Sequence, residues 1–188
     1  MQRLTLPLSI LIFSALLIAC KGETPATPTK PTEKVEPTST SKSISNDLPA
    51  DCPVTLPGKI PFEAPEPFSS TPPWPNFFWF GSDHLWTVLT TNGSWSHLPL
   101  NPEGYTQKIL WWSDRFSLKD EPEPALVVTG KRLDEKAPPL KTYGATNAFA
   151  DDIGEAMLTG VDFPTHGCWE VTGQYKETDL SFVVWISP

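Results

Sequence analysis

The 188-residue sequence has few cysteines, few histidines and a shortage of positive charge. Fourteen Lys and Arg residues face 22 Asp and Glu residues, which gives a formal net charge of −8. A chain this acidic has no broad attraction for nucleic acid or anionic lipid headgroups, so we exclude nucleic-acid binding. The sequence also lacks a G-x-S-x-G nucleophile motif, an H-E-x-x-H zinc motif, a phosphate-binding glycine loop and any CxxC pair. We therefore expect no catalytic residue, no metal and no cofactor.

One largely apolar stretch is present, from Leu4 to Ala19, and it is too short to span a bilayer. A span needs about 20 apolar residues, whereas this length, preceded by Arg3, is typical of a signal peptide. The stretch ends in Leu17-Ile18-Ala19-Cys20, which resembles the lipobox of bacterial lipoproteins. The resemblance implies that the leader, residues 1–19, is removed and that the Cys20 thiol carries diacylglycerol. An ordinary signal peptide that ends near a cysteine is the alternative.

A lipidated Cys20 would hold the protein on the extracytoplasmic side of a bacterial cell envelope. Two or three acyl chains, at about 0.8 kcal/mol per buried methylene, give stable anchoring, while one chain gives only marginal binding. Lys21 rather than an aspartate follows the cysteine, which favours the outer membrane or the cell surface. Removing 19 of the 188 residues leaves 169, and the loss of Arg3 brings the formal charge to −9.

The residues after the leader, 20–50, form a linker rich in Thr, Pro, Ser, Lys and Glu. Val35, Ile44 and Leu48 are its only large aliphatic residues, and it contains no aromatic residue. Such a segment cannot bury enough apolar surface to offset its ordering entropy, so we expect a disordered tether. At about 3.1 Å per residue, the tether would reach roughly 90 Å when extended.

The composition changes at Asp51, beyond which all eight Trp and nine of the ten Phe residues lie. We expect one domain over residues 51–188. Its first part, residues 53–75, contains eight prolines and is predicted to form an irregular strap across the domain. Short strands, proline-rich connections and little helix predict an all-β domain, an antiparallel β-sandwich of immunoglobulin-like architecture. The predicted strands are 85–89, 94–98, 108–112, 126–133, 156–163, 168–175 and 180–186.

Two further predictions concern local structure. Asn92-Gly93 is the strongest short hairpin signal, because both residues tolerate the positive φ of a type I′ turn, so the strands on either side are predicted to pair. One or two helical turns are predicted within 147–156, because Phe149, Ile153 and Met157 recur at four-residue spacing.

With Cys20 lipidated, Cys52 and Cys168 remain, and export would place them where disulfides persist. We predict that these two cysteines are joined. A metal site that uses Cys168 and the nearby His166 is the alternative, although the sequence supplies only these two ligands locally.

The stretch that contains Cys168 resembles a family block. Residues 157–173 read MLTGVDFPTHGCWEVTG, similar to the FPT-x-GCWE-[IV]-TG block of a group of bacterial lipoproteins described only as hypothetical. The similarity extends to Leu85-Trp86, Lys131–Asp134 and Leu180–Val184. That family has no assigned activity, so the resemblance implies the fold, the anchor and the disulfide, and it transfers no catalytic residue.

Within this block, strand alternation separates the cysteine from the core. Trp169, Val171 and Tyr175 are predicted to share one strand face, which leaves Cys168 on the opposite face. A bridge from Cys168 to Cys52 is therefore predicted to fasten the strap outside the sandwich core.

Aromatic residues are the one compositional excess. Residues 74–80 include five aromatics, and Trp111 and Trp112 are adjacent. Neighbouring strand residues face opposite sides, so these two tryptophans cannot both enter the same core. If exposed, Trp79, Trp111 and Trp112 would form a platform on which sugar rings stack. Burial in the core and beneath the strap is the alternative that we favour.

The function that we expect is a membrane-anchored interaction or structural module that binds an envelope protein or glycan without catalysis. The second hypothesis is a carbohydrate- or peptidoglycan-binding domain that uses exposed Trp, and the third is an envelope hydrolase that uses Asp151, Asp152 or Glu155. Carboxylates that converge in a cleft would favour the hydrolase, and coplanar exposed Trp would favour the glycan binder. A flat patch or an open sheet edge would favour the interaction module.

Overall fold

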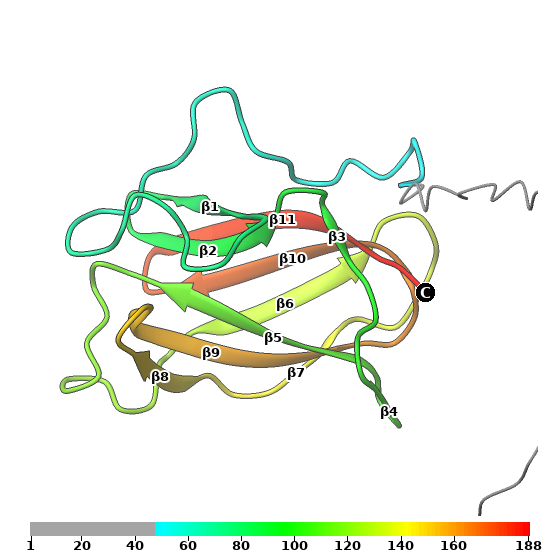
Figure 1. Ribbon diagram of the computed structural model, residues 1–188. Helices are drawn as coiled ribbons and strands as arrows, with labels where there is room; N and C mark the ends of the chain where they lie inside the picture. Colours follow the sequence, from blue (N-terminus) through cyan, green and yellow to red (C-terminus); the bar gives the residue numbers. More distant parts are fainter. Residues whose placement is uncertain (1–47) are drawn as a thin grey trace, which may run out of the picture. The chain divides into compact units, whose positions relative to one another are not determined.

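The computed structural model describes residues 48–188, so the predicted leader, Cys20 and most of the tether lie outside the described residues. The described part of the chain contains strands and no helix, and hence no helix long and apolar enough to cross a membrane. Its strands form two sheets that pack face to face (Figure 1). The predicted all-β, antiparallel sandwich is confirmed.

The larger sheet has the order β1-β2-β5-β9-β7, with antiparallel neighbours. β4 pairs with the first residues of β5. β8 pairs with the first half of β9, whereas β7 pairs with residues near the end of β9. Its strands are β1 (Phe77–Ser82), β2 (Leu85–Thr90), β4 (Leu100–Asn101), β5 (Gly104–Trp112), β7 (Lys141–Thr142), β8 (Thr146–Ala150) and β9 (Gly154–Phe163).

The smaller sheet has the order β3-β11-β10-β6. β10 is antiparallel to both of its neighbours, whereas the two-residue β3 runs parallel to β11. A tight polar turn joins β10 to β11, and Lys176 adopts a φ of 50° there. Its strands are β3 (Ser94–Trp95), β6 (Val127–Arg132), β10 (Gly167–Tyr175) and β11 (Thr178–Ile186).

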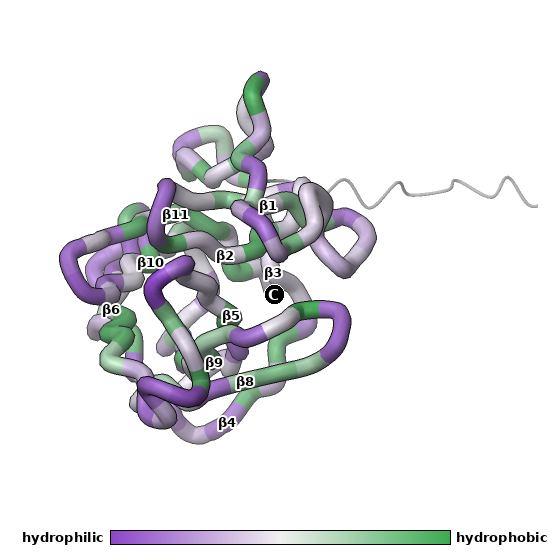
Figure 2. Tube along the Cα trace, turned by 90° about the vertical axis from the view of Figure 1, so that its left-hand side faces the viewer, coloured by the Kyte–Doolittle hydropathy of each residue, from purple (hydrophilic) through white to green (hydrophobic). Residues whose placement is uncertain are grey.

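The core between the sheets follows from the two-residue period of the strands. Trp169, Val171 and Tyr175 of β10 are buried there, as predicted, and alternate residues of β11 from Leu180 to Ile186 face the same core. Met157 and the alternate residues that follow it on β9 contribute from the other sheet. Hydrophilic residues concentrate in the peripheral connections (Figure 2).

A second apolar cluster lies on the outer face of the larger sheet, beneath the strap. Trp86 and Trp112 are fully buried in it, and Phe62 and Phe68 of the strap pack against it. β2 and β5 supply both clusters, because their successive side chains point to opposite faces. The described residues therefore form three layers, namely the smaller sheet, the larger sheet and the strap.

β1 begins inside the aromatic run 74–80, and its aromatic residues contribute to both clusters. Phe78 and Phe80 pack against the core between the sheets, while Phe77 and Trp79 belong to the cluster beneath the strap. Because apolar residues occupy both faces, the strand shows no apolar–polar alternation, and it was not among the predicted strands.

The predicted hairpin at Asn92-Gly93 is wrong. A turn is present, with a φ of 67° at Gly93, but β2 belongs to the larger sheet and β3 to the smaller one. The turn thus carries the chain across the sandwich. Gly93 also lies beneath the strap, because a Cβ atom there would be 2.7 Å from Val54 Cγ2.

The predicted helical turns within residues 147–156 are also wrong, since β8 and β9 form a hairpin there. Gly154 has a φ of 66°, and the Ile153 amide donates to the Ala150 carbonyl in the connecting turn. Tertiary pairing with β9 thus overrides the four-residue spacing of the apolar side chains.

Candidate functional site

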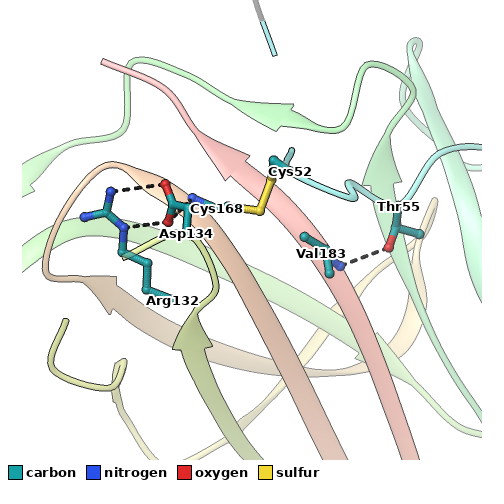
Figure 3. The surroundings of a disulfide bond; sticks show 6 residues. All are labelled: Cys52, Thr55, Arg132, Asp134, Cys168 and Val183. Carbon is teal, nitrogen blue, oxygen red and sulfur yellow. Dashed lines mark hydrogen bonds and ion pairs between the residues drawn. A yellow bond between two sulfur atoms is a disulfide. The ribbon is translucent and has the colours of Figure 1, made fainter. Parts of the chain in front are cut away.

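Cys52 and Cys168 are joined by a disulfide that closes a sequence separation of 116 residues (Figure 3). The bond lies on the outer face of the smaller sheet, because the neighbour of Cys168 on β10, Trp169, points into the core. The bridge therefore fastens the strap outside the core, as predicted. The alternative metal site at Cys168 and His166 is wrong, because the thiol is already engaged.

An ion pair supports the strand end that holds the disulfide. Arg132 Nε donates to Asp134 Oδ1 over 2.8 Å, and the same carboxylate oxygen accepts the Cys168 amide over 3.1 Å (Figure 3). The hydrogen bond from Arg132 lowers the pKa of Asp134 below its usual value, despite partial burial, and the Cys168 amide adds to this effect. The charged carboxylate thus fixes the backbone of β10 at the bridge.

Backbone hydrogen bonds continue the attachment of the strap. The Thr55 amide donates to the Val183 carbonyl over 2.8 Å, and the Val183 amide donates to Thr55 Oγ1 over 2.9 Å. The strap therefore runs beside β11, next to β3, before it crosses to the larger sheet. Its start is fixed by one covalent bond and two hydrogen bonds.

The three tryptophans proposed as a sugar platform, Trp79, Trp111 and Trp112, are all buried, so the prediction that these three residues form such a platform is wrong. Trp111 and Trp112 are 0% exposed and Trp79 is 4% exposed. Trp111 fills the core between the sheets, while Trp79 and Trp112 meet edge to face at 5.0 Å beneath the strap. The predicted division of Trp111 and Trp112 between two faces is confirmed.

A buried carboxylate lies on the outer face of the larger sheet. Asp162 accepts hydrogen bonds from Thr106 Oγ1 at 2.7 Å, Asn101 Nδ2 at 3.0 Å and Tyr143 Oη at 2.6 Å. Burial raises the pKa of Asp162, but these bonds and nearby Lys141 together lower it below its usual value. With its hydrogen bonds made by the protein itself, this cluster has a structural role. The sequence contains a signal for this site, because Asp162 lies between Val161 and Phe163, whose side chains face the core, and strand alternation places its carboxylate on the opposite face.

An acidic cleft of about 620 Å³ lies between strap residues 66–73, the β8–β9 turn and the segment that follows β5. No Lys or Arg of the described part of the chain lines it, and Phe149 at its edge is 63% exposed. Its floor and walls include Phe68, Trp79 and Phe116. The carboxylates that line it belong to Glu66, Asp114, Asp152 and Glu155.

Two of these carboxylates have partners within the protein. Glu155 Oε2 accepts the Leu118 amide over 2.9 Å, and Asp114 Oδ2 lies 3.0 Å from His84 Nδ1. Of the three acidic residues proposed for a hydrolase, Asp151 does not line the cleft. Across residues 48–188, no three His, Cys, Asp or Glu side chains are arranged to hold a metal ion.

A second concave region lies where β2 diverges from β5. The two strands pair only at Trp86–Trp112 and Thr87–Trp111, after which Thr87 Oγ1 donates to the Leu110 carbonyl. Two hollows, of about 510 and 550 Å³, adjoin this point. We call them together the neutral groove, because they share Pro75, Phe77, Trp95 and Gln107 and because no Asp or Glu within residues 48–188 lines either one.

The remaining predicted site residue, Cys20, lies outside the described residues. The sequence identified the aromatic run 74–80 but not the groove, because the groove forms only where this run, the segment 90–96 and Gln107 of β5 come together in the folded chain.

Comparisons of this chain with protein-family models, with curated proteins and with solved structures found no match.

Proposed function

We propose that this chain is a lipid-anchored binding module of the bacterial cell envelope, attached through Cys20 and without a catalytic site. The observation that carries the proposal is the Cys52–Cys168 disulfide. Structural disulfides persist in exported proteins and are rare in the cytosol. The lipobox-like end of the leader supplies an independent reason to place the domain outside the cytoplasm.

The position of the disulfide suits a tethered domain. Cys52 immediately follows the predicted linker, residues 20–50, and is joined to β10, an internal strand of the smaller sheet. A load on the amino-terminal end of the domain would pass directly into that sheet through a covalent bond. Without the bridge, the same load would act first on the two hydrogen bonds that hold Thr55 to Val183.

A hydrolase is the less supported alternative. The acidic cleft contains carboxylates, but Glu155 accepts a backbone amide and Asp114 faces His84. A pair of catalytic carboxylates needs a defined separation across a scissile bond. The partners of Glu155 and Asp114 instead favour structural roles for these two side chains.

Membrane fractionation of the full chain with its own leader, produced in a bacterium with two membranes, tests the anchor. We expect the wild-type protein in the detergent-extractable membrane fraction, with an N-terminal peptide whose mass includes diacylglycerol on Cys20. Cys20→Ser should abolish this modification and the firm membrane attachment, because a leader alone gives no acyl chain.

The matched control is the Cys52→Ser/Cys168→Ser double variant, which lacks the disulfide but keeps Cys20. It should remain acylated and membrane-bound. Recovery of unmodified wild-type protein in the soluble fraction would refute the anchor.

A further inference from the structure

The neutral groove differs in charge from the rest of this acidic chain. Among residues 48–188, Lys108 is the only charged residue that lines it, whereas the acidic cleft is lined by four carboxylates and no Lys or Arg. A cation would be attracted to the acidic cleft, and a polyanion would be repelled by the net charge of the protein. The groove is suited to an uncharged ligand.

The groove offers aromatic surface at its edge. Trp74 and Phe77 are half-buried, and their rings meet edge to face at 5.8 Å, which fixes the orientation of both. Beneath them, buried Trp95 packs against Phe163 and Phe182 of the core and forms a rigid part of the lining. Aromatic faces of this kind provide a large contact area with little loss of side-chain entropy.

Uncharged hydrogen-bonding groups line the other side. Gln107 Oε1 accepts the Lys108 amide at 2.9 Å, and Gln107 Nε2 donates no hydrogen bond to another residue within 48–188. Asn76 lines the same groove in a left-handed conformation, with a φ of 64°, fixed by the bond from the Thr91 amide to its carbonyl. Amide side chains both donate and accept, as sugar hydroxyl and acetamido groups require.

An added peptide strand fits this place less well than a sugar does. The edge of β5 that faces the groove already has local partners, since the Thr106 amide donates to the Pro99 carbonyl and Thr87 Oγ1 to the Leu110 carbonyl. The Lys108 amide is capped by Gln107. Strand addition uses these backbone groups, so a peptide would first have to displace their partners.

We propose that the neutral groove binds an uncharged oligosaccharide that carries N-acetyl groups. A sugar ring stacks on Trp74, Gln107 and Asn76 bond to hydroxyl or acetamido groups, and an acetamido methyl packs against Val88 and Leu110 on the apolar wall. This inference deepens the proposed function. It rests on the proposed location, because the cell envelope would supply the glycan. The binding itself does not require the anchor.

Calorimetric titration of the full chain in detergent, with the N-acetylglucosamine tetramer as probe, tests the proposal. We expect saturable binding with a Kd below about 1 mM, weaker binding of the glucose tetramer, and at least a tenfold loss in Trp74→Ala and in Gln107→Ala. Phe149→Ala removes an exposed aromatic ring outside the groove and should leave the Kd unchanged. Because Trp74 also packs against the apolar cluster on the outer face of the larger sheet, Gln107→Ala is the variant that tests the groove without a change in that cluster. Thermal melts establish that each variant is folded.

Three outcomes would overturn the proposal, namely no binding of either tetramer, equal binding of both, or binding that the groove variants leave intact. A photo-crosslinker at position 108 that captures only protein in intact cells would overturn it in favour of a protein partner. Titration of Cys20→Ser, which should bind the tetramer as the wild type does, separates this test from the anchor. Wild-type protein that binds the sugar but does not localise to the membrane would contradict the proposed function alone.

Discussion

At the residue scale, Asp162 is the charged group most dependent on its surroundings. It is 0% exposed, yet three donors from β4, β5 and the segment after β7 hold its carboxylate in the charged form. A buried charge is tolerated only when its hydrogen bonds are made, and loss of this acceptor would leave the half-buried donors Asn101 and Thr106 poorly satisfied. This carboxylate therefore joins four segments on the outer face of the larger sheet.

Asp162→Asn should lower the free energy of unfolding at neutral pH by roughly 2–3 kcal/mol, because the amide keeps the shape but loses the charge and one acceptor. The folded-state pKa of Asp162 is below its usual value, so its charged form stabilises the fold above about pH 4. That contribution is lost as the pH falls through the folded-state pKa. The difference between wild type and variant should therefore shrink towards about pH 2, as measured by urea denaturation.

Asp179→Asn is the matched control, because Asp179 is exposed in β11 near the β10–β11 turn. It should change the unfolding free energy by less than about 0.5 kcal/mol. A difference between wild type and Asp162→Asn that stays constant down to about pH 2 would contradict the role of the charge.

At the scale of the elements, the two-residue alternation of side chains was the sequence signal that predicted strands correctly. β10 and β11 were predictable because alternate residues of each pack into the core between the sheets. The Asn92-Gly93 turn was predictable as a turn, but local φ preferences do not specify which sheet the next strand joins. In 147–156, side chains four residues apart share a face in a helix and also in a strand, so the spacing of Phe149 and Ile153 could not separate the two.

The strap is the element whose attachment is most open to test. In the Cys52→Ser/Cys168→Ser variant we expect a loss of unfolding free energy of up to about 4–5 kcal/mol, the chain-entropy value for a loop of this length. Hydrogen exchange should accelerate at the amides of Thr55 and Val183, which bond across the junction between strap and sheet. The β1–β2 hairpin, paired over six residue pairs, should keep its protection. Unchanged exchange at Thr55 would show that the strap holds its place without the bridge.

At the scale of the whole molecule, the two apolar clusters are coupled through shared strands. Trp111 and Trp112 are neighbours in β5, yet one packs between the sheets and the other beneath the strap. Their burial on opposite faces followed from the sequence, whereas the groove could not be predicted, because residues from the strap, β1, β2 and β5 meet there only in the folded chain. The architecture makes the strap a third layer rather than a loose cover.

Phe68→Ala tests whether the strap belongs to the cooperative unit. The Phe68 ring packs edge to face on Trp86 at 5.3 Å and lies over Gly154, so its removal exposes the outer cluster. If the strap unfolds together with the sheets, the variant should lose roughly 1–3 kcal/mol of global stability in urea, with an unchanged m-value and coincident tryptophan-fluorescence and far-UV transitions. Phe149→Ala, which removes an exposed ring, should shift the midpoint little. Separate transitions for the two probes in wild-type protein would mean that the strap melts first, and the outer cluster would then stabilise the strap alone.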